Sequence, residues 1–266
     1  ILVRTEERAP ERGEIALERL HRPFVVGDEE AIGAEEVGVV VVLLLVRVET
    51  GATQRLLPRG ALRTASPLSV LYALSALLAV TVTCTEIFLP LFLQVLHGRS
   101  PLEAGYIAAL MSAGWTAAAV TGAGLRGRRL NFVLRASPVL SLASLATLVV
   151  ILPRPGDGSW AELGPVCVAL VAVGMAVGMA YPHLSARVLQ VAPRDENELA
   201  ASSIMTVQLS ATALGAALAG LTVNLAGLAG GGGEMDVESA ARWLFVVLLV
   251  APVMCLWLMR TGGRLH

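Results

Sequence analysis

Apolar residues fall in six long runs along this chain, and polar residues gather in short stretches between them. A helix needs about 20 mostly apolar residues to cross the hydrocarbon core of a bilayer, and the runs meet that requirement. The runs are Leu68–Leu96, Leu102–Leu125, Phe132–Leu152, Leu163–Leu184, Leu199–Leu228 and Ala240–Met259. The pattern therefore predicts an all-α membrane protein with six full transmembrane helices.

The breaks between the runs contain the residue types of turns. Proline, glycine and charged residues occupy positions 97–101, 153–158 and 192–197, and four glycines follow one another at 230–233. A seventh apolar run, Val37–Val46, is too short to cross a bilayer alone. It is either the end of a preceding helix or a stub at the membrane interface.

The composition supports a membrane protein and excludes several other classes. Hydrophobic residues make up 55% of the chain, and the mean hydropathy is +0.70, which is too apolar for an ordinary soluble domain. The three cysteines, Cys84, Cys167 and Cys255, lie in separate apolar runs and are expected to be reduced and buried. No metal-binding spacing and no phosphate-binding loop occurs, so we expect no metal site and no ATP hydrolysis.

The same search finds no sign of catalysis or of nucleic-acid binding. No cluster of His, Asp or Glu falls at a membrane face, so an enzyme is not expected. No basic patch interleaved with aromatic residues is present, so no nucleic acid is expected as a partner.

Arginines are distributed unevenly among the breaks, and this predicts the orientation. One set of alternate segments holds Arg47, Arg55, Arg59, Arg63, Arg126, Arg128, Arg129, Arg135, Arg187, Arg194, Arg260 and Arg264. The other set holds only Arg99, Arg154 and Arg242. Because basic residues are retained in the cytoplasm, both ends of the six-helix unit are expected there, in the inner membrane of the cell.

Residues 1–36 do not share the pattern of the rest. They contain five Arg and ten Asp or Glu, with no apolar core after a basic start, so they are not a signal peptide. They are expected to be disordered or foreign to the domain, with a cytoplasmic cap as the alternative. Residues 37–66 form the apolar stub and a cytoplasmic linker, 67–260 the six-helix domain and 261–266 a cytoplasmic tail.

Glu86 is the chain's strongest functional candidate. It lies inside the first full run, where a carboxylate is costly and usually faces a cavity or a partner. A low-dielectric environment favours the neutral form, so such a group can take up and release a proton near neutral pH. The functional interpretation is a proton-coupling group. The alternative is a permanently protonated acid that hydrogen-bonds to a neighbouring helix.

A polar stripe accompanies this residue. Thr83, Glu86, Pro90 and Gln94 are spaced by three, four and four, so they share one helix face. Pro90 removes a backbone hydrogen bond and favours a kink. The stripe is typical of a helix that lines a cavity.

Other candidates are spread over three further runs. Gly174 and Gly178 are four apart, which favours close helix packing, with a moving gate as the alternative. Gln208 is a pathway candidate, and Ser203, Thr206 and Ser210 share another face of its run. Trp115 is either a cavity wall or a lipid-facing side chain. His183, near a predicted helix end, is either a solvated interface residue or a proton carrier.

Several segments resemble one family. Thr85–Gln94 (TEIFLPLFLQ) and Ser100–Tyr106 (SPLEAGY) are similar to the seventh-to-eighth helix region of major facilitator superfamily transporters of the bacterial drug:proton antiporter kind. Gly114–Ala117, Gly178–Ser185 and Glu198–Ser203 fit the same group, and Leu57–Arg63 resembles its cytoplasmic linker. The resemblance covers about residues 40–260.

This resemblance implies half of a transporter with twelve or fourteen helices, made of two three-helix repeats, residues 68–152 and 163–259. It implies that the first and fourth spans line a central cavity, which favours Glu86, Gln94 and Tyr181 as pathway residues. The loop with Arg126, Arg128 and Arg129 is similar to the superfamily's basic motif, although the usual Asp is absent.

We therefore expect proton-coupled efflux of small amphipathic or cationic compounds by alternating access, with the proton gradient as energy source and no cofactor. The expected partners are the lipid bilayer, a small-molecule substrate, and either a missing N-terminal half or a second copy. The alternative is a non-transporting membrane fragment or assembly partner.

Overall fold

The computed structural model describes residues 56–61, 66–156, 158–228 and 234–262. These residues all belong to the compact unit Glu49–His266. The acidic segment 1–36 and the apolar run Val37–Val46 lie outside the described residues, so the structure does not test the predictions made for them.

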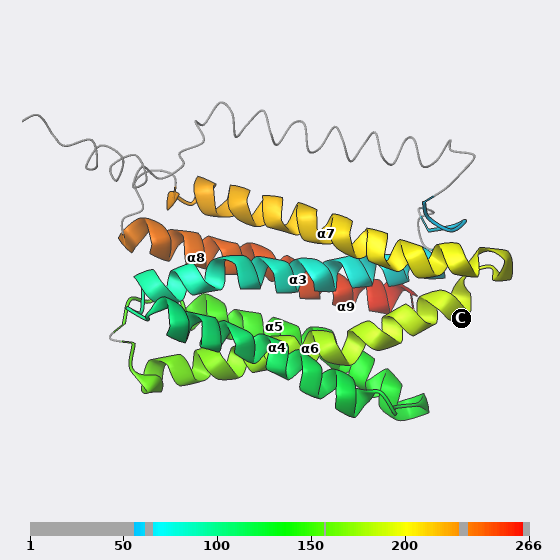
Figure 1. The fold of residues 1–266 in the computed structure, drawn as a ribbon, viewed down its shortest axis with the longest axis horizontal. Helices are drawn as coiled ribbons and strands as arrows, with labels where there is room; N and C mark the ends of the chain where they lie inside the picture. Colours follow the sequence, from blue (N-terminus) through cyan, green and yellow to red (C-terminus); the bar gives the residue numbers. More distant parts are fainter. Residues whose placement is uncertain (1–55, 62–65, 157, 229–233, 263–266) are drawn as a thin grey trace, which may run out of the picture. The chain divides into compact units, whose positions relative to one another are not determined.

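The described part of the chain is helical, and its long helices lie side by side (Figure 1). The elements are α3 (Pro67–Val95), α4 (Pro101–Gly122), α5 (Gly127–Ile151), α6 (Trp160–Val191), η1 (Arg194–Glu196), α7 (Asn197–Leu225), α8 (Glu234–Leu248) and α9 (Val250–Gly262).

Six helical spans in these residues are long and apolar enough to cross a membrane, which confirms the predicted fold class. The sixth span, Met235–Thr261, consists of α8 and α9 with a break at Leu249. Pro252 follows that break and has no N–H to donate to the carbonyl of Leu248, so the helix is interrupted there.

All six spans begin before the apolar runs that predict them, and the fourth and sixth also end after those runs. The fourth span was expected over Leu163–Leu184 and extends over Trp160–Val191. Arg128 and Arg187, which lie outside the apolar runs, are therefore part of α5 and α6.

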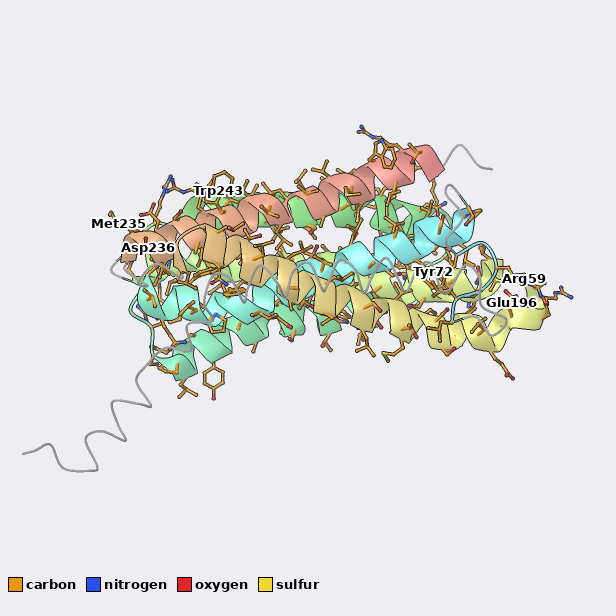
Figure 2. The ribbon with its side chains drawn as sticks, turned by 90° about the horizontal axis from the view of Figure 1, so that it is seen from above. Arg59, Tyr72, Glu196, Met235, Asp236 and Trp243 are labelled. Atoms are coloured by element: carbon orange, nitrogen blue, oxygen red, sulfur yellow. The ribbon has the colours of Figure 1, made fainter. Side chains whose placement is uncertain are left out.

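Successive spans run in opposite directions, so the connections gather at two ends. We call the end with residues 56–61, 123–126 and 192–196 the arginine-rich end. The end with residues 96–100, 152–156, 158–159 and 226–228 is the opposite end. Arg59, Tyr72 and Glu196 lie toward the first, and Met235, Asp236 and Trp243 toward the second (Figure 2).

The two three-helix sets, α3–α5 and α6–α9, interlock. The first helix of each set packs against the second and third helices of the other set: α3 contacts α7, α8 and α9, and α6 contacts α4 and α5. Such reciprocal packing, in which the first helix of each set contacts the other set, is expected of two related repeats. As a result α6 is the most buried span, with 56% of its apolar stretch buried, against 17% for the span containing α7.

Apolar side chains form one core cluster toward each end. The cluster at the opposite end is built around Phe92, which stacks on Phe88 and meets Phe245 of α8 edge-on, with ring centroids 6.2 and 6.3 Å away. The cluster at the arginine-rich end contains Tyr72 and Cys255 together with apolar residues of α5, α6 and α7.

The connections at the opposite end are tied to one another. Ser100 and Glu103 form a capping box that starts α4. Nε2 of the buried His97 lies 3.1 Å from the Leu152 carbonyl, and Arg99 donates to the Gly158 carbonyl. These bonds hold the α3–α4 turn against the α5–α6 connection.

A salt bridge joins distant segments at the arginine-rich end. The Arg59 backbone N–H donates to Glu196 Oε2 at 2.7 Å, and its Nε lies 3.0 Å from Glu196 Oε1. Ser66 caps α3 by accepting from the Ser69 N–H, and its own hydroxyl donates to the Gly60 carbonyl. The segment that enters α3 is thereby fixed to the start of α7.

Glycines allow α4 and α6 to meet backbone to backbone. A Cβ atom on Gly174 would lie 1.9 Å from the Met111 carbonyl oxygen, and one on Gly178 would lie 2.3 Å from that of Trp115. On the other helix, a Cβ on Gly114 would lie 2.2 Å from the Val171 carbonyl oxygen. Only residues without a side chain fit this contact.

The contact between α3 and α7 uses hydrogen bonds. The Tyr72 hydroxyl lies 2.5 Å from Ser203 Oγ, and both side chains are buried. Further along the same pair, the Cys84 thiol donates to the Gly215 carbonyl at 3.2 Å. Partners within the protein are needed at these depths because hydrocarbon offers none.

Gly174→Ala is expected to lower the free energy of unfolding by about 1–3 kcal/mol, because the added methyl group overlaps the α4 backbone. Gly164→Ala is the matched control on the same helix, since a Cβ there meets nothing within 4 Å. It should be neutral or stabilising by up to ~1 kcal/mol. Thermal unfolding in detergent compares the two; equal melting temperatures would contradict the close contact.

Tyr72→Phe is expected to destabilise the α3–α7 contact by about 0.6 kcal/mol, the average for a hydrogen bond between membrane helices, and by no more than about 1.7 kcal/mol. Tyr106→Phe is the control, because Tyr106 is 70% exposed and has no hydrogen bond within the described residues. The measurement is chemical unfolding in mixed micelles. If both variants unfold alike, the Tyr72–Ser203 bond contributes nothing.

Candidate functional site

Glu86 lies on the exposed side of α3, within a helix that is long and apolar enough to span a membrane. Its neighbour Ile87 is also exposed, whereas Cys84 and Thr85 on the other side of the helix are buried. Within the described ranges its carboxyl has no hydrogen bond and no ion pair. This face of the helix therefore presents an unpaired acid at membrane depth.

The rest of the predicted polar stripe lies beside it in a partly buried state. Thr83 donates to Thr212 of α7, with the two oxygens 3.5 Å apart. Pro90 cannot donate to the Glu86 carbonyl, which removes one backbone hydrogen bond of α3 at this level. Gln94 donates to the Pro90 carbonyl at 2.9 Å, so its amide is used locally.

Trp115 and Tyr181 come together from α4 and α6. Their ring centroids lie 5.8 Å apart with planes tilted by 39°, one turn from the glycine contact. Ser185, the next turn of α6, donates to the Tyr181 carbonyl. In the part of the chain that is described, no hydrogen bond, ion pair or ring contact links this aromatic pair to Glu86.

His183 ties α6 to the end of α4, because its Nε2 lies 3.1 Å from the Gly122 carbonyl oxygen. On α7, Gln208 is half-buried, Ser203 is buried, and Thr206 and Ser210 are exposed. The three hydroxyl residues predicted to share a face thus differ in environment, since Ser203 is drawn inward by Tyr72.

The basic residues Arg126, Arg128 and Arg129 lie at the start of α5 and are exposed. Gly127, between the first two, has φ of +57°, which reverses the chain after α4. The guanidinium groups of all three have no carboxylate partner among the described residues.

Two further features escaped the sequence analysis. Gly114 has no second glycine four residues before or after it, unlike Gly174 and Gly178. Arg59 and Glu196 are 137 residues apart, and only their opposite charges hinted at a pair.

Exposed small and polar residues are concentrated on α4 and α7. Only 28% of the apolar stretch of α4 and 17% of that of the α7 span is buried. The exposed positions include Gly105, Ser112, Thr116 and Thr121 on α4 and Ser202, Thr206, Ser210 and Thr212 on α7. Small residues permit close approach of another helix.

Comparison with known proteins gives a consistent result. The family model described as Major Facilitator Superfamily matches residues 2–216 of this chain. The match includes residues 2–55, which the structure does not describe.

Two curated proteins of Mycobacterium tuberculosis, from strains CDC 1551 / Oshkosh and ATCC 25618 / H37Rv, are each 34% identical to the chain over 170 residues. Both carry the name "Probable multidrug-efflux transporter". The aligned region covers 63% of this chain and 35% of each relative, so the chain matches about a third of their length.

Glu86→Cys tests whether the exposed face of α3 meets water or lipid. In a chain with Cys84, Cys167 and Cys255 replaced by Ala, a charged maleimide should label position 86, because thiolate forms only where water reaches the sulfur. Val139→Cys is the control, since Val139 is 54% exposed on α5 among apolar residues. Equal protection of both thiols, measured by mass shift in intact membranes, would indicate lipid around Glu86.

Proposed function

This chain belongs to the Major Facilitator Superfamily, and we propose that it takes part in proton-coupled efflux of small amphipathic or cationic compounds by alternating access. The efflux names of its two relatives and their 34% identity support the transport class. The observation that carries the coupling mechanism is the unpaired carboxyl of Glu86 on the exposed side of α3.

An unpaired carboxylate at membrane depth is costly, so it persists where it faces a cavity or exchanges partners. In its neutral form Glu86 requires no counter-charge. In its ionised form it attracts a cation. One group can therefore hold a proton or a cationic substrate in alternation, and the two compete for the same charge.

Pro90 supports movement of this segment, since α3 lacks one backbone hydrogen bond one turn beyond Glu86. Gln94, Trp115, Tyr181 and Gln208 are proposed to contribute to the pathway. Trp115 and Tyr181 offer an aromatic surface to an apolar or cationic compound.

A second six-helix unit is proposed to complete the pathway. The exposed faces of α4 and α7 are rich in small and hydroxyl residues, which suit helix contacts in a membrane. Such a unit would cover Glu86 from lipid. The arginine-rich end is proposed to face the cytoplasm of the inner membrane.

The test is export of a fluorescent cationic dye from membrane vesicles under an imposed proton gradient, with this chain expressed alone. Glu86→Gln is expected to abolish gradient-driven export, because the amide cannot exchange a proton. Glu162→Gln is the matched control: Glu162 is an exposed carboxyl in the first turn of α6, outside the apolar core.

Export that stays gradient-dependent in Glu86→Gln would contradict the coupling role. Loss of export in both Glu86→Gln and Glu162→Gln would mean that replacing a carboxyl group by an amide disturbs folding, whichever carboxyl is replaced. Absence of export by the correctly inserted wild-type chain, over a panel of dyes, would mean that the six helices do not transport without a second unit.

A further inference from the structure

Three arginines lie near Asn131 at the arginine-rich end, one through a hydrogen bond and two through helical spacing. Arg187 of α6 donates from Nη2 to Oδ1 of Asn131 on α5, at 3.2 Å. Arg128 and Arg135 lie three residues before and four residues after Asn131 on the same helix. Residues at these spacings are neighbours on a helix surface. The α5–α6 contact therefore brings three guanidinium groups to one face.

This face is exposed and basic. Arg128, Asn131, Arg135 and Arg187 are all exposed. The guanidinium groups form no ion pair with any described residue. Like charges this close repel one another, so the arrangement is stable only if water, salt or a bound anion screens it.

The packed elements supply no compensating acid. In the helices that contact this region, α5 and α9 contain no acidic residue, and the acids of α4 and α6 are Glu103 and Glu162 at the opposite end. Arg260 of α9 adds a further positive charge at this end. The nearest described carboxylates along the chain are those of 195–198, where Asp195 and Glu196 pair with Arg59.

The opposite end shows a different arrangement. Arg99 lies 3.5 Å from Glu103, and Arg242 lies 2.5 Å from Glu238. These two arginines have carboxylate partners within the chain. Arg128, Arg135 and Arg187 have none among the described residues, and helical spacing together with the Arg187–Asn131 bond brings them to one face.

An apolar aromatic side chain lies within the same patch. Phe132 is 73% exposed, four residues after Arg128 and three before Arg135. It is close to the start of a membrane-spanning helix, where an apolar ring such as that of Phe packs at the boundary of head groups and acyl chains. The patch thus combines cationic groups with an apolar surface at the depth of lipid head groups.

We propose that Arg128, Arg135 and Arg187 form a binding site for an anionic phospholipid. The guanidinium groups bind the phosphate oxygens, Asn131 orients Arg187, and Phe132 packs against an acyl chain. Arginine suits this role because its planar donors match phosphate oxygens. The site concerns lipid binding at the side of the bundle, so it does not depend on the proposed transport activity.

The test is native mass spectrometry of the full chain, purified in detergent with equal amounts of phosphatidylglycerol and phosphatidylcholine. The wild type should retain phosphatidylglycerol preferentially. Arg128→Gln/Arg187→Gln should lower the ratio of bound phosphatidylglycerol to phosphatidylcholine by about tenfold or more, since each arginine near an anionic surface contributes roughly fivefold. Arg126→Gln/Arg129→Gln removes the same charge from the same end and should leave the ratio nearly unchanged.

Asn131→Leu provides a test without a change in charge. It removes the acceptor that holds Arg187, so the lipid ratio should fall partly. If Arg128→Gln/Arg187→Gln does not elute as a folded, monodisperse species, the lipid ratio measured for Asn131→Leu tests the proposal in its place.

Three results would overturn the proposal. One is a wild type without preference for the anionic lipid. Another is an equal loss in Arg126→Gln/Arg129→Gln, which would indicate general surface charge. The third is displacement of phosphatidylglycerol by millimolar inorganic phosphate, which would identify a site for soluble anions.

Discussion

The contact between the backbones of α4 and α6 is the constraint on which the arrangement of the other spans depends. Gly114, Gly174 and Gly178 leave no room for a Cβ, so the two helices have one register in which they fit. That register brings Trp115 onto Tyr181 and the carbonyl of Gly122 onto His183. It also holds α6 at the centre of the bundle, where α5 packs on another side and presents Asn131 to Arg187.

Hydrocarbon provides no hydrogen-bond partners, and most polar groups of the bundle find theirs inside the protein. Ser137 donates to the Ala176 carbonyl, Tyr72 meets Ser203, and Cys84 reaches the Gly215 carbonyl. Two features of the described residues bear on the proposals made above: Glu86, an unpaired acid within a membrane span, and the arginines near Asn131. Both lack an opposite charge, and both are exposed at the surface of the bundle. Under the two proposals, a proton or a cation would satisfy Glu86 and an anion would satisfy the arginines.

The sequence predicts the spans well because the bilayer sets a length that an apolar run must reach. It predicts their ends poorly, because a helix continues past hydrocarbon as long as its backbone bonds are made; Arg128 and Arg187 are thus helical. Glu86, Pro90 and Gln94 could be grouped from helical spacing alone. Contacts between distant segments could not be predicted from spacing, because each depends on which segments are neighbours in the fold. The examples are Trp115 with Tyr181, Tyr72 with Ser203, and Arg59 with Glu196. Gly114 shows the same limit, since its contact is with Val171 on another helix.

The interlocked sets also suggest where the bundle can change shape. The α3–α7 and α4–α6 contacts are equivalent, because in each the first helix of one set packs against the second helix of the other set. The two contacts nevertheless differ in chemistry. Backbone atoms meet directly in the first, and a shift there would separate surfaces that fit in one way. The second rests on hydroxyl and thiol groups, such as Thr83 with Thr212, which can exchange partners at small cost. Glu86 lies one turn from Thr83 on the same helix and next to the bond that Pro90 removes. Under the proposed mechanism a proton therefore arrives at the more adaptable of the two contacts, where a change of one charge has the least packing energy to overcome.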